Sequence, residues 1–171
     1  MKVLCVIDMQ NDFIDGALGT KEAQAIVGKV KEKIELYRKN GDRVIFTRDT
    51  HGEDYLSTSE GKRLPVPHCI KGSEGWQISP ELDTDGCEII DKPTFGSYEL
   101  AERVAETENL EGVELLGLCT DICVISNAML IKARVYEAPV SVNGSASAGV
   151  TPESHRNALE SMKMCQINII D

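Results

Sequence analysis

Apolar and polar positions along the chain follow two periods, which predict strands and helices in turn. Short continuous apolar runs with polar borders predict buried strands. These runs cover residues 2–8, 43–47, 87–91, 113–118, 135–142 and 166–170. Apolar residues spaced by three or four positions predict helices. Those segments cover residues 21–39, 98–108, 121–134 and 152–164.

Strands that alternate with helices are typical of parallel βαβ units. We therefore expect an α/β fold with three layers, αβα: a six-stranded, mostly parallel sheet covered by helices on both faces. The length of 171 residues favours a single domain over residues 1–171. One irregular stretch, from Arg48 to about Pro80, is longer than an ordinary connection and is therefore predicted to be functional.

Composition and charge narrow the range of partners. The chain has 18 Lys and Arg against 28 Asp and Glu, a formal net charge of −10. Because no basic cluster is present, nucleic acid is not an expected partner, and a small neutral or cationic substrate is favoured. There is no apolar run of about 18 residues and no signal-like start, so we expect no membrane partner and a cytoplasmic protein. The six cysteines are then expected to be free thiols.

Chemically useful side chains stand where predicted strands end. Asp8 closes the first strand, Lys92 follows the third, and Cys123 comes shortly after the fourth. In a parallel sheet these strand ends share one edge, where active sites lie. Taken alone, each residue has a plainer reading: a cap, a surface charge or a small buried side chain. Taken together, they suit nucleophilic catalysis by a thiolate.

The roles follow from the residue types. Cys123 falls in the first turn of its predicted helix, where the helix dipole and the Lys92 ammonium would favour a thiolate. Asp8 could take the thiol proton and deliver it to a departing amine. Backbone N–H groups in the turn from Cys119 to Cys123 could form an oxyanion hole.

A second group of polar side chains lies in and beside the long irregular stretch. Asp49 and His51 follow the second strand, and His68 lies further along. One carboxylate and two imidazoles suit Zn²⁺, Mn²⁺ or Fe²⁺. Glu60 is a further candidate ligand, directly or through water. The alternative is that the histidines only hydrogen-bond within the loop and that Glu60 is a solvated surface acid.

Several segments carry a family resemblance. They are CVIDMQNDF (5–13), RDTH (48–51), LPVPHCIKGSEGW (64–76), DKPTFGS (91–97) and LGLCTDICVISNA (116–128). With the tail 145–162 they span nearly the whole chain. The chain resembles the isochorismatase-like cysteine hydrolases, and within them the nicotinamidases.

The resemblance implies the isochorismatase-like hydrolase fold and a catalytic triad of Asp8, Lys92 and Cys123. It implies that Asp49, His51 and His68, with Glu60, bind a divalent metal ion, zinc first and manganese or iron as alternatives. It also implies a cis peptide between Leu118 and Cys119, and an oxyanion hole from the N–H groups of Cys119 and Cys123. Phe13, and less directly Phe95, would contact the substrate, and a homo-oligomer is expected by analogy.

The activity that the resemblance implies is conversion of nicotinamide to nicotinic acid and ammonia through a Cys123 thioester, as in NAD salvage. The metal would bind the pyridine nitrogen and orient the carboxamide. Two positions depart from the family pattern: Val66 stands where some members have a stacking tryptophan, and Asn143 replaces a common acid. Trp76 is expected to pack rather than to bind substrate, and His155 to lie at the surface or in an interface.

Two alternatives remain open. The first is a hydrolase of another small amide, such as a carbamoyl or ureido compound. The second is a non-catalytic protein that binds a metal or ligand on the same scaffold, for which an unreactive Cys123 would be the sign.

Overall fold

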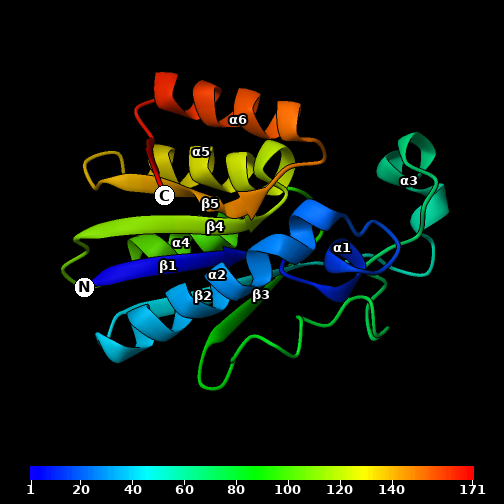
Figure 1. The fold of residues 1–171 in the computed structure, drawn as a ribbon, viewed down its shortest axis with the longest axis horizontal. Helices are drawn as coiled ribbons and strands as arrows, with labels where there is room; N and C mark the ends of the chain where they lie inside the picture. Colours follow the sequence, from blue (N-terminus) through cyan, green and yellow to red (C-terminus); the bar gives the residue numbers. More distant parts are fainter.

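A computed structural model describes the whole chain, residues 1–171, and shows one six-stranded parallel sheet (Figure 1). Its strands are β1 (Lys2–Ile7), β2 (Arg43–Asp49), β3 (Glu88–Lys92), β4 (Gly112–Leu118), β5 (Val140–Ala148) and β6 (Asn168–Ile170). They lie in the order β3-β2-β1-β4-β5-β6, and every neighbouring pair is parallel. The predicted α/β fold with helices around a six-stranded sheet is confirmed.

Helices cover both faces of the sheet. The longer helices are α2 (Lys21–Lys39), α4 (Tyr98–Ala105), α5 (Ile125–Arg134) and α6 (Pro152–Met164). Alternate residues of β1 show the division, because Leu4 and Val6 pack with α2, whereas Val3, Cys5 and Ile7 pack with α4, α5 and α6. Both faces of the central strands are therefore buried, which explains why β1 reads as an uninterrupted apolar run.

The order in which strands are added to the sheet switches sides between β1 and β4. From β1 the chain winds outward through β2 and β3, and from β4 it winds outward through β5 and β6. Parallel sheets bind ligands in the crevice beyond the carboxyl ends of the strands at such a point. The long irregular stretch, with a 3-10 turn at Tyr55–Ser57 (η1) and α3 (Ser59–Arg63), extends beyond these ends, away from the N-terminus (Figure 1). A short helix α1 (Asn11–Ile14) follows β1 on the same side.

The boundaries of β5 differ most from the prediction, which was residues 135–142. The strand begins only at Val140, because Pro139 lacks an N–H and residues 135–138 form a turn closed by a hydrogen bond from Ala138 to Val135. It then continues to Ala148 through a segment of small residues that gives no apolar pattern. Its pairing with β4 shifts within this segment, and the Asn143 side chain bridges the irregularity by accepting the Ala146 N–H at 2.9 Å.

The predicted helix over 121–134 is two elements. Residues Thr120–Val124 form a π-helical turn (η2), and the α-helix proper begins at Ile125. The predicted helix over 98–108 ends earlier, at Ala105, and a positive φ of 50° at Asn109 turns the chain toward β4. Strand boundaries elsewhere differ by one or two residues.

Candidate active site

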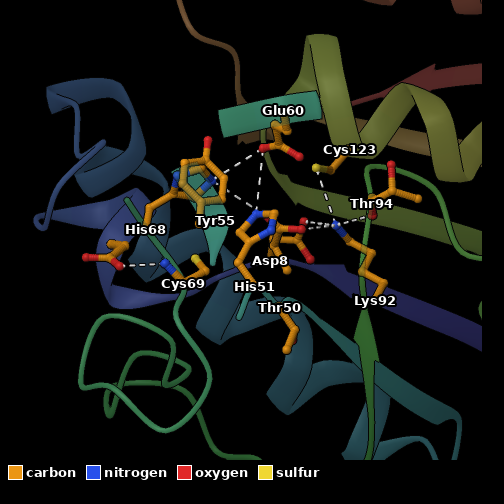
Figure 2. A network of polar contacts seen from close by, with 12 residues as sticks. Asp8, Thr50, His51, Tyr55, Glu60, His68, Cys69, Lys92, Thr94 and Cys123 are labelled. Carbon is orange, nitrogen blue, oxygen red and sulfur yellow. Dashed lines mark hydrogen bonds and ion pairs between the residues drawn. The ribbon is translucent and has the colours of Figure 1, made fainter. Parts of the chain in front are cut away.

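Asp8, Lys92 and Cys123 meet at the carboxyl ends of β1, β3 and β4 (Figure 2). Lys92 lies between the other two. Its Nζ is 2.6 Å from Asp8 Oδ2 and 3.5 Å from Cys123 Sγ. All three side chains are buried, so the sequence prediction that they converge at one sheet edge holds in the structure.

Asp8 is held in a defined orientation. It lies just past β1 with a φ of +47°, which turns the chain away from the sheet. The Thr47 hydroxyl donates to Asp8 Oδ1 at 2.6 Å and accepts the Asp8 N–H at 3.2 Å. Oδ2 is ion-paired with the Lys92 ammonium, 2.6 Å away. Thr47 therefore fixes one carboxylate oxygen, and the other faces Lys92.

The three groups shift one another's pKa. Burial raises the pKa of Cys123 well above its ordinary value, and the charge of Asp8 raises it further, while Lys92 lowers it. Burial also raises the pKa of Asp8 against the lowering effect of Lys92. Burial would lower the pKa of Lys92, but the charges of Asp8 and Cys123 raise it above its usual range. Lys92 thus acts on the Cys123 pKa in the predicted direction, and burial and Asp8 act against it.

The four predicted metal ligands also come together. One donor atom from each of Asp49, His51, Glu60 and His68 lies within 4.8 Å of every other. Asp49 Oδ2 is 2.9 Å from His51 Nε2 and 3.6 Å from His68 Nε2. Glu60 Oε1, carried by α3, is 3.6 Å from both Nε2 atoms (Figure 2).

This donor set fits a divalent metal. Four ligands at about 2.0–2.1 Å from a tetrahedral zinc ion stand about 3.3 Å apart. Four of the six donor pairs are separated by 2.9 to 3.6 Å, which brackets that value, and all six lie within 4.8 Å. His68 is also oriented for ligation, because its Nδ1 is bonded to the Val66 carbonyl at 2.8 Å and leaves Nε2 facing the other donors. Burial would raise the pKa of Asp49, but hydrogen bonds with both histidines and the Lys92 charge hold it well below its usual range.

The two groups share Asp49. While Oδ2 faces the histidines, Oδ1 lies 3.5 Å from Lys92 Nζ. The Lys92 ammonium is therefore placed among three potential anions: Asp8, Asp49 and Cys123. It neutralises part of the charge that burial would otherwise disfavour.

Aromatic rings line the metal-ligand group. Tyr55 is buried, with its ring 4.7 Å from that of His51 and 5.0 Å from that of His68. The ring of the predicted substrate contact Phe13 is 5.5 Å from that of His68. Phe95 is 41% exposed, and its backbone is tied to the Cys123 turn, since Asn127 Nδ2 donates to the carbonyls of both residues.

The structure also shows where the other residues singled out in the sequence lie. Leu118–Cys119 is a cis peptide, as the resemblance implied. Trp76 is 8% exposed, and its Nε1 donates to the Thr50 hydroxyl at 2.8 Å, which agrees with a packing role. His155 is half-buried, and its Nδ1 is 2.8 Å from the Thr120 hydroxyl, so it supports the turn behind Cys123 from within the chain. All six cysteines are separate thiols.

Sequence reasoning missed four side chains that shape the site: Gln10, Thr47, Tyr55 and Asn127. Each is polar or aromatic and buried, and each hydrogen-bonds or packs against a predicted site residue. The only local signal was a polar residue at the end of a strand, for Thr47, or just beyond one, for Gln10. Neither position reveals its partner without the fold.

Comparison with known proteins places the chain in a family. The isochorismatase domain matches residues 2–171. The chain belongs to the isochorismatase family. A nicotinamidase/pyrazinamidase of Mycobacterium tuberculosis is 27% identical over 190 residues, covering 99% of this chain and 98% of the relative.

Solved structures agree with this assignment. A pyrazinamidase/nicotinamidase from Streptococcus mutans is 31% identical, with a TM-score of 0.87, over 99% of this chain and 100% of the other. A pyrazinamidase of Pyrococcus horikoshii, solved in complex with zinc, is 29% identical, with a TM-score of 0.83, over 99% and 98%. These findings confirm the resemblance, the fold and the enzyme class, a hydrolase acting on amide carbon–nitrogen bonds.

Proposed function

We propose that this isochorismatase-family protein is a metal-dependent nicotinamidase, which converts nicotinamide to nicotinic acid and ammonia. The observation that carries the proposal is the Asp8–Lys92–Cys123 cluster, with Lys92 within 2.6 and 3.5 Å of the other two, directly beside the group of four metal donors. The similarity to nicotinamidases over almost the whole chain supports the choice of substrate.

The chemistry begins with the buried thiol. As Sγ of Cys123 attacks the carboxamide carbon, its proton passes to the Asp8 carboxylate, which Lys92 and Thr47 hold in place. The N–H groups of Cys119 and Cys123 stabilise the oxyanion. Asp8 then returns the proton to the nitrogen as the carbon–nitrogen bond breaks, and ammonia leaves a thioester on Cys123. Water, with Asp8 as base, cleaves the thioester to the acid and the thiol.

Lys92 keeps these steps balanced in charge. Before attack it pairs with the Asp8 carboxylate at 2.6 Å. When Asp8 takes the proton, the ammonium faces the developing negative charge on Cys123 Sγ, 3.5 Å away. Its carbonyl partner Thr94 O, at 3.1 Å, holds it in place throughout.

Asp49, His51, His68 and Glu60 are the residues that would bind the metal; these donors suit zinc, manganese or iron, and zinc is proposed first because a related pyrazinamidase was solved in complex with it. When bound, a divalent ion supplies a Lewis-acid position for the ring nitrogen of the substrate. Phe13, beside His68, would contact the ring, and Phe95 would form a second wall. Homo-oligomeric assembly and a cytoplasmic location stay predictions. None of the helices combines the length and the hydrophobicity that a membrane-spanning segment requires.

The direct test is release of ammonia from nicotinamide by the purified protein loaded with Zn²⁺ or Mn²⁺. We expect turnover in the wild type and in Cys165→Ala, because Cys165 is an exposed thiol 42 residues after Cys123 in the sequence. Cys123→Ala should lose about 10³-fold or more of kcat, because the nucleophile is removed. Undiminished turnover by Cys123→Ala would refute the proposal.

The substrate is tested separately from the reaction class. Val66 has no aromatic ring that could stack on a pyridine, so a substrate other than a pyridine amide is the alternative to test. The same ammonia assay with carbamoyl and ureido compounds addresses that alternative. Release from these, with none from nicotinamide, would move the assignment to another small amide. Release from no amide, with metal bound, would favour a non-catalytic binding protein.

A further inference from the structure

Two polar side chains just beyond β1, Gln10 and Asp12, have no part in the chemistry proposed above. Gln10 is fully buried. Its Oε1 accepts the Asp49 N–H at 2.7 Å, and its Nε2 donates to the Asp49 carbonyl at 2.9 Å. The side-chain amide thus pairs with both backbone groups of a metal-ligand residue. The second Nε2 hydrogen is directed to the Trp76 carbonyl, at 2.9 Å.

The geometry of the sheet explains why Asp49 needs this partner. β1 pairs with β2 as far as Val6 and Phe46, and the chain then turns away at Asp8. No β1 backbone reaches Asp49 on that side, although β3 still pairs with it on the other through Lys92. The Gln10 amide occupies the position of the missing strand. Buried backbone groups without such a partner would be costly.

Asp12 plays the equivalent part for the histidine segment. Its Oδ2 accepts the N–H of Cys69 at 2.8 Å, in the peptide that follows His68. Cys69 has a φ of +48°, and its carbonyl accepts the His51 N–H at 3.0 Å. The Asp12 carboxylate therefore anchors the point at which the backbones of both histidines meet.

The fit around Asp12 is tight. The backbone of Gly75 packs directly on its carboxylate, and a Cβ at that position would overlap the carboxylate atoms. The Asp12 N–H also donates to the Gly75 carbonyl at 3.0 Å. Asp12 is thus fixed from both its backbone and its side chain.

We propose that Gln10 and Asp12 are positioning residues for metal binding: Gln10 holds the backbone of Asp49, and Asp12 holds the segment that carries His68 and meets His51. This inference rests on the metal site in the proposed function. It implies that the segment supplying Asp8 also sets the spacing of the metal ligands, so that both halves of the site are built on one short stretch of chain.

The test is Zn²⁺ affinity of the metal-free full-length protein, measured by competition with a chromogenic chelator. Gln10→Met and Asp12→Ala should each weaken binding by about 10–100-fold, as is usual when the support of a ligand is removed. Asp12→Asn keeps an acceptor for the Cys69 N–H and should stay within about threefold of the wild type. Asn11→Ala is the matched control, because the Asn11 side chain bonds only the exposed Glu74 carbonyl, at 2.9 Å.

Two further readouts separate positioning from general loss of structure. The visible absorption of bound Co²⁺ reports ligand geometry and should change in Gln10→Met and Asp12→Ala but not in Asp12→Asn or Asn11→Ala. Thermal unfolding of the metal-free variants shows whether they fold. If Gln10→Met does not fold, the comparison of Asp12→Ala with Asp12→Asn decides.

The outcomes distinguish the two proposals. If the wild-type protein binds no Zn²⁺, the proposed metal site is refuted, and the proposed metal dependence with it. A wild-type protein that binds Zn²⁺, with Gln10→Met and Asp12→Ala binding equally well, would overturn only the inference about positioning.

Discussion

At the scale of single residues, we expect burial to keep the nucleophile in its thiol form until substrate binds. Cys123 is 5% exposed and faces an ammonium and a carboxylate at once. Desolvation disfavours the thiolate more than Lys92 favours it. We therefore expect the proton to pass to Asp8 only when a substrate carbonyl is in place, because the sulfur then bonds to the carbonyl carbon and no buried thiolate has to persist. This order would protect a cysteine that must wait for substrate.

The state of Cys123 can be tested by replacing its proton acceptor. In Asp8→Asn the carboxylate charge that raises the Cys123 pKa is gone, while Lys92 remains. We expect hydrolysis to fall by about 10³-fold, yet alkylation of Cys123 by iodoacetamide at neutral pH to accelerate by about tenfold. Labelling is followed by mass spectrometry of the Cys123 peptide, with exposed Cys165 as the internal reference.

In the wild type, Cys165 should react before Cys123. A wild-type Cys123 that outpaces Cys165, or an Asp8→Asn protein whose Cys123 reacts no faster, would contradict the resting thiol. Because slow labelling is expected of the active enzyme, an unreactive Cys123 does not by itself indicate a non-catalytic protein.

The residues with chemistry of their own could be predicted from the sequence, whereas the residues that support them could not. Asp8, Lys92 and Cys123 are recognisable because a carboxylate, an ammonium and a thiol all follow apolar runs. Thr47 closes the second run, and in sequence it reads as one more β-branched strand residue. Its role depends on Asp8, which lies 39 residues away, and only the pairing of β1 with β2 brings them together.

At the scale of elements, α5 joins the nucleophile to the wall of the site. Asn127, in its first turn, donates to the Cys123 carbonyl at 2.8 Å and to the Phe95 carbonyl at 3.0 Å. Its Oδ1 accepts the Ser97 N–H at 2.9 Å. The loop that connects β3 to α4 is thereby fixed to the same helix that follows Cys123. Lys92 secures the other end of this loop through Thr94.

Replacing Asn127 should loosen this loop. In Asn127→Ala three backbone groups lose their partner, and two of them, the Ser97 N–H and the Cys123 carbonyl, are buried. A buried group left unsatisfied costs about 1–3 kcal/mol. We expect amide exchange at Ser97 to accelerate and KM for the amide to rise by about tenfold or more, with a smaller effect on kcat. The measurements are hydrogen exchange and steady-state kinetics.

Ser126→Ala is the control on the same helix, since the Ser126 hydroxyl bonds only the Ile122 carbonyl within its own helical segment. Equal KM values in both variants would show that Asn127 does not hold the substrate wall.

Strand and helix identities were predictable, but their irregular portions were not. The apolar runs that became β1 and β4 are buried on both faces and give an unambiguous signal. The second half of β5, NGSASA, is also a strand, yet its small residues fit under α2 and show no pattern of their own. The π-helical turn that carries Cys123 resembles an ordinary helix in sequence, because its residues are as apolar as those of the helix that follows.

At the scale of the whole molecule, burial in the α/β core keeps several acidic side chains protonated at alkaline pH, where the same groups in the unfolded chain would ionise. Burial raises the pKa of Cys5, in the middle of β1, to about 12, against a smaller lowering by Arg43. Burial likewise raises the pKa of Cys119 to about 12. Tyr37 donates to the buried Glu114 at 2.9 Å, and burial together with this carboxylate raises the pKa of Tyr37 above its usual range.

The sign of the effect on stability follows from these directions. A thiol with a raised pKa in the folded protein stays protonated there while the unfolded chain ionises. Its contribution to the free energy of unfolding is complete below about pH 8.5 and is lost as the pH rises toward about 12. Each such group lowers stability by about 1.4 kcal/mol per pH unit across that window.

We therefore expect the free energy of unfolding by urea, measured under reducing conditions at several values between about pH 8 and 11, to fall with increasing pH. Cys5→Ala should be less stable at every pH, because it leaves a cavity in the core. Its slope with pH should nevertheless be shallower by about one proton, since one buried thiol no longer titrates. Cys165→Ala, altered at an exposed thiol, should keep the wild-type slope. Equal slopes in Cys5→Ala and Cys165→Ala would mean that the core thiol ionises in the folded protein as readily as in the unfolded chain, and that water reaches β1 through the helices that cover it.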